Sequence, residues 1–304
     1  MSNGDAVLII AGSTASGKTE LAIELAREFD AEIVGADSRQ IYRDMPVGTA
    51  APSPEQRRAV PHHLIEFLDP RERYSAARYA SDALDAIGEI RGRGKRAIVA
   101  GGTGFYIRAL TGGVTLAPQY DEALRSRLAQ EARLHGPEFL HGWLERRDPA
   151  RARALGANDT YRVLRALEIA LAAPAAAVRS GAARTLATQG LRGLLVFLDL
   201  PWSVIDERIA ARTQRMLASG LIDEAQRLGS EAVAANAVGF PQALAHLRGW
   251  STEAELRAAL ERATRRYARR QRAWFRGEPE TVWIAPARVR ALVREKLGWS
   301  EKRA

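Results

Sequence analysis

Short apolar runs alternate with helical patterns over much of the chain. Each run has the length of a buried strand rather than of a helix. The runs are at residues 6–11, 32–36, 96–100 and 194–199. Between them, apolar side chains recur at helical spacing, as at Ala22, Leu25 and Phe29, which gives a helix one face to pack on a sheet. This alternation predicts an α/β fold in which helices flank a parallel sheet.

The middle of the chain has a different pattern. From about residue 118 to residue 190, helical patterns such as 121–134 and 159–172 follow one another without a strand. A chain of 304 residues is long enough for one large α/β domain and a smaller insert. We therefore expect a core of residues 1–117 and 191–304 that is interrupted by an all-helical insertion domain of residues 118–190.

The composition narrows the chemistry. The chain has no cysteine, which excludes disulfides, thiolate catalysis and cysteine-ligated zinc, and its five histidines lack H-x-x-x-H spacing. Any metal is therefore expected to be a hard cation bound by oxygen atoms. No apolar run is long enough to span a membrane, and the N-terminal stretch lacks the features of a secretory signal. We expect a cytoplasmic monomer without a membrane partner.

The net charge of +9 favours a polyanionic partner such as nucleic acid. Arginines are concentrated in one helical stretch near the end of the chain, at Arg262, Arg265, Arg266, Arg269, Arg270, Arg272 and Arg276. Tyr267, Trp274 and Phe275 are interleaved with them. Arginines beside aromatic rings suit phosphate contacts and base stacking on RNA, and the alternative is a solvated basic face with a core-facing aromatic seam.

The first apolar run leads directly into a phosphate-binding motif. Residues 12–19 fit the G-x-x-x-x-G-K-T pattern of a P-loop between a strand and a helix. They are Gly12, Ser13, Thr14, Ala15, Ser16, Gly17, Lys18 and Thr19. The glycines let backbone N–H groups point inward at a helix start, where Lys18 adds a cation and the hydroxyl of Thr19 can bind Mg²⁺. The motif predicts a diphosphate or triphosphate ligand and a P-loop NTPase-like sheet.

Three further features are expected near this loop. Asp37 directly follows the second apolar run, and the carboxyl ends of parallel strands face the ligand crevice. A second glycine-rich turn, residues 101–104, follows the third run and serves either a ligand or close helix packing. Arg208, Arg212 and Arg215 share one helical stripe, which suits a clamp on a departing phosphate or a solvated basic face.

Several of these stretches together resemble bacterial tRNA dimethylallyltransferases. The matching segments are residues 12–19, 37–42, 47–50, 61–65, 74–75, 101–106 and 269–276. The resemblance spans nearly the whole chain. The sequence departs from the family at three places. This chain has Ala51 where the family usually has a lysine, and Phe240-Pro241-Gln242 where a tyrosine followed by a basic residue is usual. It has Ala172-Ala173-Pro174 where Ser-Gly-Lys is common.

The resemblance implies transfer of a dimethylallyl group from dimethylallyl diphosphate to N6 of the adenine on the 3′ side of a tRNA anticodon. The P-loop would hold the prenyl diphosphate with Mg²⁺, and Lys18, Thr19 and Arg212 would stabilise the departing diphosphate. Asp37 would orient the adenine amine and accept its proton. The adenine would have to leave the anticodon stack to reach this site.

The resemblance also implies a contact surface for the tRNA anticodon stem-loop. The implied tRNA-binding residues are Asp37, Ser38, Arg39, Gln40, Thr103, Arg125, Tyr161, Arg162, Arg165, Gly239, Phe240, Arg269, Arg270, Gln271, Arg272, Trp274 and Arg276. On this reading the late arginine helix is an anticodon-stem contact rather than a solvated face.

Three other functions share parts of the pattern. A small-molecule kinase would use Asp37 to activate a hydroxyl, with Arg208 and Arg212 as a lid over ATP. An adenylate isopentenyltransferase would prenylate free adenine nucleotides without needing the arginine helix. A non-catalytic RNA-binding P-loop protein is the third alternative, and Asp37 beside Lys18 and Thr19 argues against it.

Overall fold

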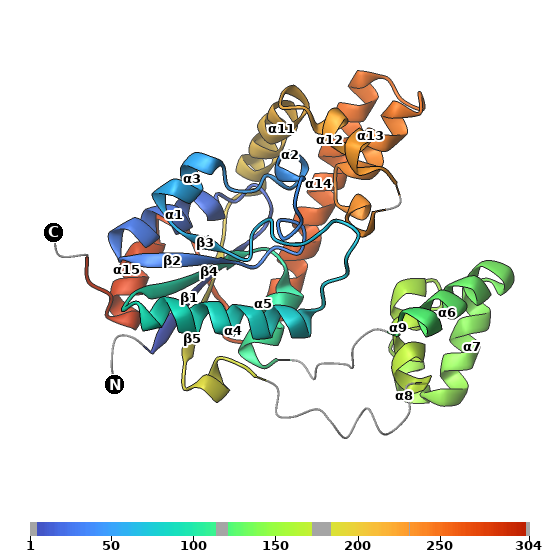
Figure 1. Cartoon of the computed structure of the whole chain (residues 1–304), viewed down its shortest axis with the longest axis horizontal. Helices are drawn as coiled ribbons and strands as arrows, with labels where there is room; N and C mark the ends of the chain where they lie inside the picture. Colours follow the sequence, from blue (N-terminus) through green and yellow to red (C-terminus); the bar gives the residue numbers. More distant parts are fainter. Residues whose placement is uncertain (1–4, 114–120, 172–183, 231, 302–304) are drawn as a thin grey trace. The chain divides into compact units, whose positions relative to one another are not determined.

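The computed structural model describes residues 5–113, 121–171, 184–230 and 232–301, and six parallel strands in these residues form one sheet (Figure 1). The strands are β1 (Ala6–Gly12), β2 (Ala31–Gly35), β3 (His62–His63), β4 (Arg96–Gly101), β5 (Arg192–Leu198) and β6 (Val282–Ile284). Their order across the sheet is β3-β2-β4-β1-β5-β6. The four longer strands confirm the predicted α/β sheet. The edge strands β3 and β6 were missed because two or three residues are too short to show a period.

The chain divides into two units, a core unit of Met1–Val114 and Arg184–Ala304 and a helical unit of Thr115–Ala183. The helical unit ends before residue 190, where the sequence pattern had placed the boundary. The backbone N–H of Leu186 donates to the carbonyl of Leu110 (2.9 Å), and the side chain of Leu186 is buried. These contacts hold the short 3₁₀ helix η1 (Ala187–Gln189) on the core unit.

Helices cover both faces of the sheet (Figure 1). The described helices of the core unit, including those that lie beside the sheet, are α1 (Lys18–Glu28), α2 (Pro46–Thr49), α3 (Pro54–Ala59), α4 (Ala76–Gly92), α5 (Gly104–Thr111), α11 (Trp202–Ala218), α12 (Leu221–Leu228), η2 (Val233–Asn236), α13 (Phe240–Leu247), α14 (Glu253–Arg276) and α15 (Pro286–Leu297). Phe29 at the end of α1, Val293 of α15 and Trp299 share one apolar cluster with Leu8 and Ile98 of the sheet. Helix α4 packs against β2 and β4 instead.

A second apolar cluster holds the chain segment that follows β2. Ile41 and Met45 from this segment pack with Leu221 of α12, Phe240 of α13 and Leu256 of α14, and all five side chains are buried. Helices α12, α13 and α14 therefore form a wall beside the carboxyl edge of the sheet and fix the segment that begins with Asp37.

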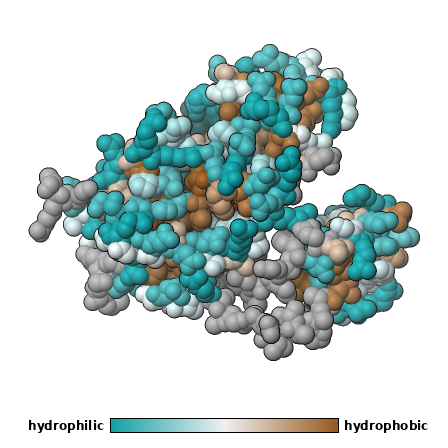
Figure 2. Space-filling model, in the orientation of Figure 1, coloured by the Kyte–Doolittle hydropathy of each residue, from teal (hydrophilic) through white to brown (hydrophobic). Residues whose placement is uncertain are grey.

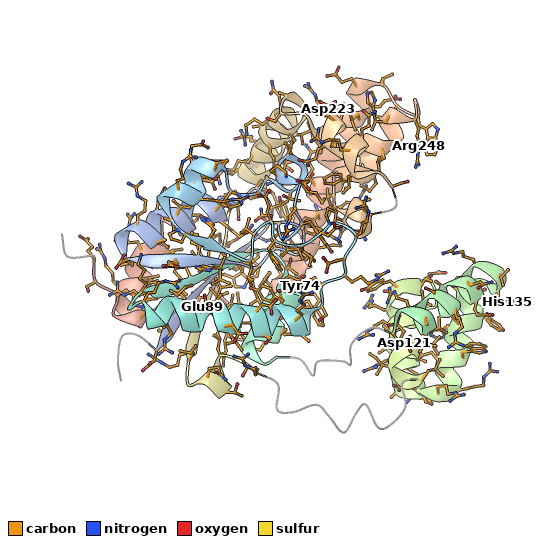
Figure 3. The ribbon with its side chains drawn as sticks, viewed as in Figure 1. Tyr74, Glu89, Asp121, His135, Asp223 and Arg248 are labelled. Carbon is orange, nitrogen blue, oxygen red and sulfur yellow. The ribbon has the colours of Figure 1, made fainter. Side chains whose placement is uncertain are left out.

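The helical unit has its own core. Its described helices are α6 (Glu122–His135), α7 (Pro137–Arg147), α8 (Pro149–Arg153) and α9 (Thr160–Leu171). Leu128, Leu140 and Val163 pack together in its centre. The carboxylate of Asp121 caps α6 by accepting from the N–H of Leu124 (2.9 Å), and Figure 3 shows Asp121 and His135 at the two ends of this helix. The departure Ala172-Ala173-Pro174 lies outside the described residues.

Polar side chains predominate on the face of the molecule seen in Figure 2, where apolar residues form separate patches. Exposed large apolar side chains include Leu134 and Tyr161 of the helical unit and Leu247 and Trp250 of the core unit. None of the helices in the described part of the chain combines the length and apolar character needed to cross a membrane.

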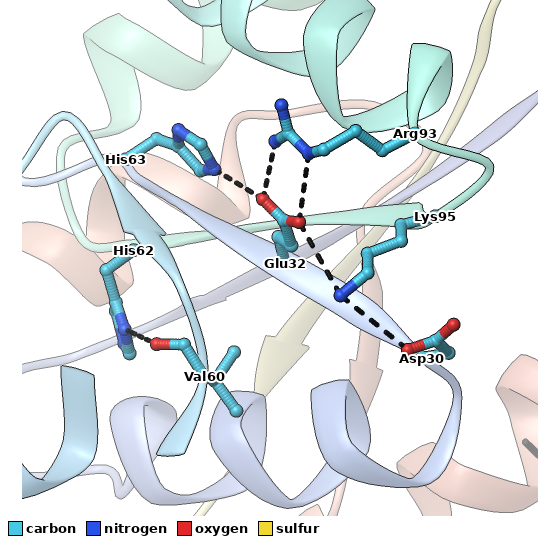
Figure 4. Close-up of polar contacts among 7 residues, drawn as sticks. All are labelled: Asp30, Glu32, Val60, His62, His63, Arg93 and Lys95. Atoms are coloured by element: carbon cyan, nitrogen blue, oxygen red, sulfur yellow. Dashed lines mark hydrogen bonds and ion pairs between the residues drawn. The ribbon is translucent and has the colours of Figure 1, made fainter. Parts of the chain in front are cut away.

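A buried carboxylate ties β2, β3 and the turn before β4 together (Figure 4). Glu32 Oε2 accepts from Arg93 Nη2 and lies near His63 Nε2, both at 2.7 Å, and Lys95 Nζ lies 3.7 Å from Oε1. Burial by itself would raise the pKa of Glu32, but the hydrogen bonds of Arg93 and His63 lower that pKa below its ordinary value of 4.5. The charged form of Glu32 therefore stabilises the fold.

We expect Glu32→Gln to lower the free energy of unfolding by about 1–3 kcal/mol at neutral pH, because it removes charge-assisted hydrogen bonds to a buried group. The pKa of Glu32 is lower in the folded than in the unfolded chain. Its contribution is therefore complete above the unfolded value of about 4.5 and is lost as the pH falls through the folded value.

Urea unfolding of the wild type and Glu32→Gln from neutral to acidic pH measures this effect, and the gap between the two proteins should close in acid. Glu55→Gln is the matched control, since its pairing with Arg58 lies on the exposed surface, and it should change stability little at any pH. A pH-independent gap for Glu32→Gln would contradict the assignment.

Candidate active site

A cleft with a volume of about 1350 Å³ opens beside the carboxyl edge of the sheet. Residues 14–19 of the P-loop line it together with Asp37. Arg208, Arg212 and Arg215 of α11 also line it, so this arginine stripe faces the cleft. Gly12 and Ser13 do not line it, because Gly12 is still paired in β1 and Ser13 is buried behind the loop. The structure thus brings the phosphate-binding loop, Asp37 and the arginine stripe of α11 to one cavity.

The P-loop has the backbone conformation of an anion nest. Ala15 and Gly17 adopt left-handed φ angles of 64° and 85°, while the N–H of Ser16 donates to the carbonyl of Ser13 (3.2 Å). Left-handed residues alternating with right-handed ones turn successive N–H groups toward one side of the chain. Helix α1 begins at Lys18, so its free N–H groups and partial positive charge add to this nest.

Lys18 is held inside the loop that it serves. Its ammonium donates to the carbonyl of Ser13 at 2.8 Å. Burial lowers the pKa of Lys18 to about 8, the carboxylate of Asp37 acts against this shift, and Arg212 adds to it. Asp37, Lys18 and Arg212 all line the cleft, so the carboxylate and the two cations share one cavity.

The turn after β4 fixes the backbone on both sides of Asp37. The N–H of Thr103 donates to the carbonyl of Ala36 (3.1 Å), and Thr103 Oγ1 accepts from the N–H of Ser38 (2.9 Å). The hydroxyl of Thr103 also donates to Ser38 Oγ (3.2 Å). Asp37 Oδ1 accepts from the N–H of Arg39 (2.9 Å). Thr103 and Ser38, both predicted as tRNA contacts, therefore bond to each other and position the carboxylate.

Arg212 is positioned by a chain of contacts that the sequence did not reveal. Its guanidinium donates to the carbonyl of Thr49 (3.3 Å), to which Gln40 Nε2 also donates (3.2 Å). The helix that contains Thr49 is held in turn by Glu224. The carboxylate of Glu224 accepts from the N–H groups of Val47 (2.9 Å) and Gly48 (2.7 Å) at the start of α2. Glu224 is a further residue of the site, and its hydrogen bonds to backbone groups far away in the chain leave no motif or period in the sequence.

Tyr267 of α14 is a second cleft residue whose place was not predicted. It is half-buried and lines the cleft with Arg270. Burial and the nearby carboxylate of Asp37 raise the pKa of Tyr267, so its hydroxyl remains protonated at neutral pH. Tyr267 and Gln271 are one helical turn apart, so helical spacing was the signal that could have placed both on the cleft side of α14.

Two residues that were predicted as tRNA contacts, Phe240 and Gln271, have buried side chains. Phe240 is fully buried in the cluster with α12 and α14, and a Cβ at Gly48 would overlap its ring. Gln271 is only 5% exposed, and its amide bonds to the N–H of Thr14 (2.7 Å) and the carbonyl of Gly102 (3.0 Å). Gly239 adopts a φ of 114° at the start of α13, where glycine is favoured.

The arginine helix α14 presents only part of its charge to solvent. Arg269, Arg270 and Arg276 are exposed. Arg272, also predicted as a tRNA contact, instead bonds to Asp199 Oδ1 (2.6 Å) and to the carbonyl of Leu200 (3.2 Å). Trp274 is also largely packed inside, with the Arg108 guanidinium 4.3 Å from its ring centre and Phe105 at 6.3 Å.

The predicted tRNA-binding residues of the helical unit differ in exposure. Arg125 is buried, and its Nη1 lies 2.7 Å from Glu168 Oε1, while Arg165 Nη1 bonds to the other oxygen of Glu168 at the same distance. The guanidinium of Arg125 also lies 5.2 Å from the ring centre of Tyr161, which is exposed. Arg162 is exposed and pairs with Asp159. Arg125 therefore joins α6 to α9 from a buried position within the helical unit.

Comparison with known proteins gives matches over nearly the full chain. Residues 40–278 match the family described as IPP transferase, and residues 5–71 match that described as isopentenyl transferase. A tRNA dimethylallyltransferase from Anaeromyxobacter sp. (strain K) is 46% identical over 301 residues, which cover 96% of this chain and 97% of that protein. The tRNA dimethylallyltransferase 1 of Pelobacter propionicus is 40% identical over 301 residues and 97% of each chain.

Solved structures agree with the sequence matches. The tRNA isopentenylpyrophosphate transferase of Bacillus halodurans superposes with a TM-score of 0.69 at 32% identity and covers 97% of both chains. A eukaryotic dimethylallyltransferase acting on tRNA superposes with a TM-score of 0.73 at 25% identity and covers 98% of this chain and 81% of that one. The α/β fold with its P-loop is therefore shared over both units of the chain.

We expect the affinity for inorganic pyrophosphate to fall as the pH rises through about 8, because Lys18 loses its charge there. Well above this pH the fall should approach about tenfold per pH unit. Titration calorimetry between about pH 6 and about pH 10 measures the effect. Lys18→Arg is the matched control, since arginine keeps its charge over this range while the ligand ionises in the same way. Equal pH profiles for both proteins would contradict the role of Lys18.

Proposed function

The chain belongs to the IPP transferase family, and we propose that it transfers the dimethylallyl group of dimethylallyl diphosphate to tRNA. The acceptor is N6 of the adenine on the 3′ side of the anticodon, and the products are N6-(dimethylallyl)adenosine in tRNA and diphosphate. The observation that carries this proposal is that Asp37 and the P-loop line the same cleft. A carboxylate and an anion cradle in one cavity match the two ends of this reaction.

The P-loop end of the cleft suits the departing diphosphate. The carbon–oxygen bond of the allylic diphosphate breaks while positive charge develops on the allyl carbon. The nest of backbone N–H groups, Lys18 and Arg212 stabilise the negative charge that collects on the leaving group. Lys18 is half-buried, and an interaction that is partly shielded from water is stronger than the same interaction in bulk solvent.

Mg²⁺ fits this end of the cleft as a partner of the diphosphate. Among the described residues, no group of three or more histidine, aspartate or glutamate side chains could hold a metal by itself. The cation would therefore be bound by diphosphate oxygens and by the hydroxyl of Thr19, which lines the cleft. When bound, it adds positive charge beside the leaving group.

The Asp37 end of the cleft suits the acceptor. The lone pair of the adenine amine is delocalised into the ring, so the nitrogen is a weak nucleophile. Asp37 would accept a proton from the amine as the new carbon–nitrogen bond forms. Thr103 holds the backbone on both sides of Asp37, and the N–H of Arg39 donates to the carboxylate itself, which lines the cleft.

The tRNA would reach the cleft with its adenine extruded from the anticodon loop. A cleft of about 1350 Å³ has room for a nucleotide beside the prenyl group. The exposed Arg269, Arg270 and Arg276 would bind phosphates of the anticodon stem, and exposed Tyr161 and Arg162 would add contacts from the helical unit. We propose that the protein acts as a monomer in the cytoplasm.

A labelling experiment tests this function. The protein is incubated with labelled dimethylallyl diphosphate and Mg²⁺ together with unmodified tRNA, with AMP or with neither, and ATP consumption is followed in parallel. We expect label in tRNA alone and no ATP turnover. Label in AMP would indicate an adenylate isopentenyltransferase, and ATP turnover would indicate a kinase.

We expect Asp37→Ala to lower the transfer rate by about 10²–10⁴-fold while tRNA binding is retained, because it removes a general base. Single-turnover transfer and a tRNA binding titration measure the two effects separately. Asp37→Asn keeps the shape of the side chain and serves as the second variant. Transfer at the wild-type rate in both variants would exclude Asp37 as the base.

Arg269→Ala combined with Arg270→Ala should weaken tRNA binding and lower the slope of log affinity against log salt by about one to two, because two phosphate contacts are lost. The affinity for pyrophosphate should stay unchanged. The control replaces Arg27 and Arg192, two exposed arginines that do not line the cleft, by alanine. If both double variants changed the salt slope equally, net charge alone would explain the effect.

A further inference from the structure

Gln271 has an unusual position in the arginine helix. It is 5% exposed, whereas its neighbours Arg269 and Arg270 on the same turn of α14 are exposed. A polar amide inside a protein normally needs partners for both its donor and its acceptor. The partners of Gln271 are backbone groups of two separate loops, which makes the residue a bridge.

The two bonds of Gln271 reach two separate loops at the carboxyl edge of the sheet. Its Oε1 accepts from the N–H of Thr14 in the P-loop at 2.7 Å, and its Nε2 donates to the carbonyl of Gly102 at 3.0 Å. A Cβ at Gly102 would overlap the Gln271 amide, so glycine is required there for the side chain to enter. The second glycine-rich turn thus serves helix packing at this position.

Each bridged loop carries one half of the site. Thr14 precedes Ala15, whose left-handed φ of 64° helps to form the anion nest. Gly102 precedes Thr103, which bonds to the backbone on both sides of Asp37. A displacement of α14 would therefore act on the diphosphate-binding loop and on the turn that holds the carboxylate through one side chain.

We propose that Gln271 is a positioning residue that sets the conformation of the P-loop and couples it to the tRNA-binding face of α14. The effect of Gln271 on the P-loop is argued from its two hydrogen bonds, to Thr14 and to Gly102. The coupling to tRNA rests on the proposed function. Because Arg269 and Arg270 lie on the turn that carries Gln271, an RNA that engages them fixes the helix and thereby the loop. Coupling of this kind is reciprocal, so pyrophosphate must raise RNA affinity by the factor by which RNA raises pyrophosphate affinity.

The test compares wild type, Gln271→Leu and Gln271→Glu. Titration calorimetry measures the binding of inorganic pyrophosphate with Mg²⁺, with and without a saturating anticodon stem-loop RNA. Leucine removes the hydrogen bonds that the Gln271 amide makes with the N–H of Thr14 and the carbonyl of Gly102. In the absence of RNA, we therefore expect pyrophosphate to bind about three- to tenfold more weakly. Glutamate keeps the acceptor for Thr14, but it loses the donor and adds negative charge, so we expect weaker binding here too.

In the wild type, the RNA should strengthen pyrophosphate binding by about fivefold or more, and in Gln271→Leu this factor should fall toward one. Gln226→Leu is the matched control, since Gln226 is exposed on α12 and does not line the cleft, and it should behave as the wild type. Thermal unfolding shows which variants are folded.

Unchanged pyrophosphate affinity in a folded Gln271→Leu or Gln271→Glu protein would overturn the positioning role. A coupling factor that is absent in the wild type, or equal in wild type and Gln271→Leu, would overturn the coupling. Prenyl transfer by the wild-type sample is assayed alongside. Weaker pyrophosphate binding in the variants together with no transfer to tRNA would refute the proposed function while the role of Gln271 in the P-loop stood.

Discussion

The carboxylate of Asp37 depends on the contact between two turns that leave neighbouring strands of the sheet. β2 and β4 are paired in parallel, so the turns that follow them emerge side by side at the same edge. Thr103 bonds to the carbonyl of Ala36 and to the N–H of Ser38, which leaves Asp37 little freedom. β1 lies next to β4 on its other side and places the P-loop at this edge as well.

The rest of the cleft is built by helices that lie late in the sequence. Arg212 of α11 donates to the carbonyl of Thr49, and Glu224 of α12 holds the segment that contains Thr49 by accepting from the N–H of Gly48. Helix α14 contributes Tyr267 to the same cleft and is fixed at its end by Arg272, whose guanidinium lies 5.6 Å from the ring centre of Trp202 and 5.3 Å from that of Trp283. The cleft and the exposed arginines of α14 therefore share one support.

Local patterns predicted much of the fold and the centre of the site. The P-loop and Asp37 could be found because a strand, a turn and a helix in succession place them, and each signal lies within a few residues. The burial of Phe240 and Gln271 could not be predicted because it depends on Gly48 and Gly102, which are far away in the chain. Glu224 was missed for the same reason. Contacts of this kind leave no periodicity in a single sequence, and neither did β3 and β6, which are too short.

The bond between Lys18 and the carbonyl of Ser13 has a consequence for turnover. This bond uses one of the three N–H donors of the ammonium, so the side chain is anchored in its own loop while further donors can bind an anion. An arriving diphosphate therefore meets a cation that is already in place, and little side-chain freedom is lost when it binds. The same anchor keeps the lysine at the loop after the product has left.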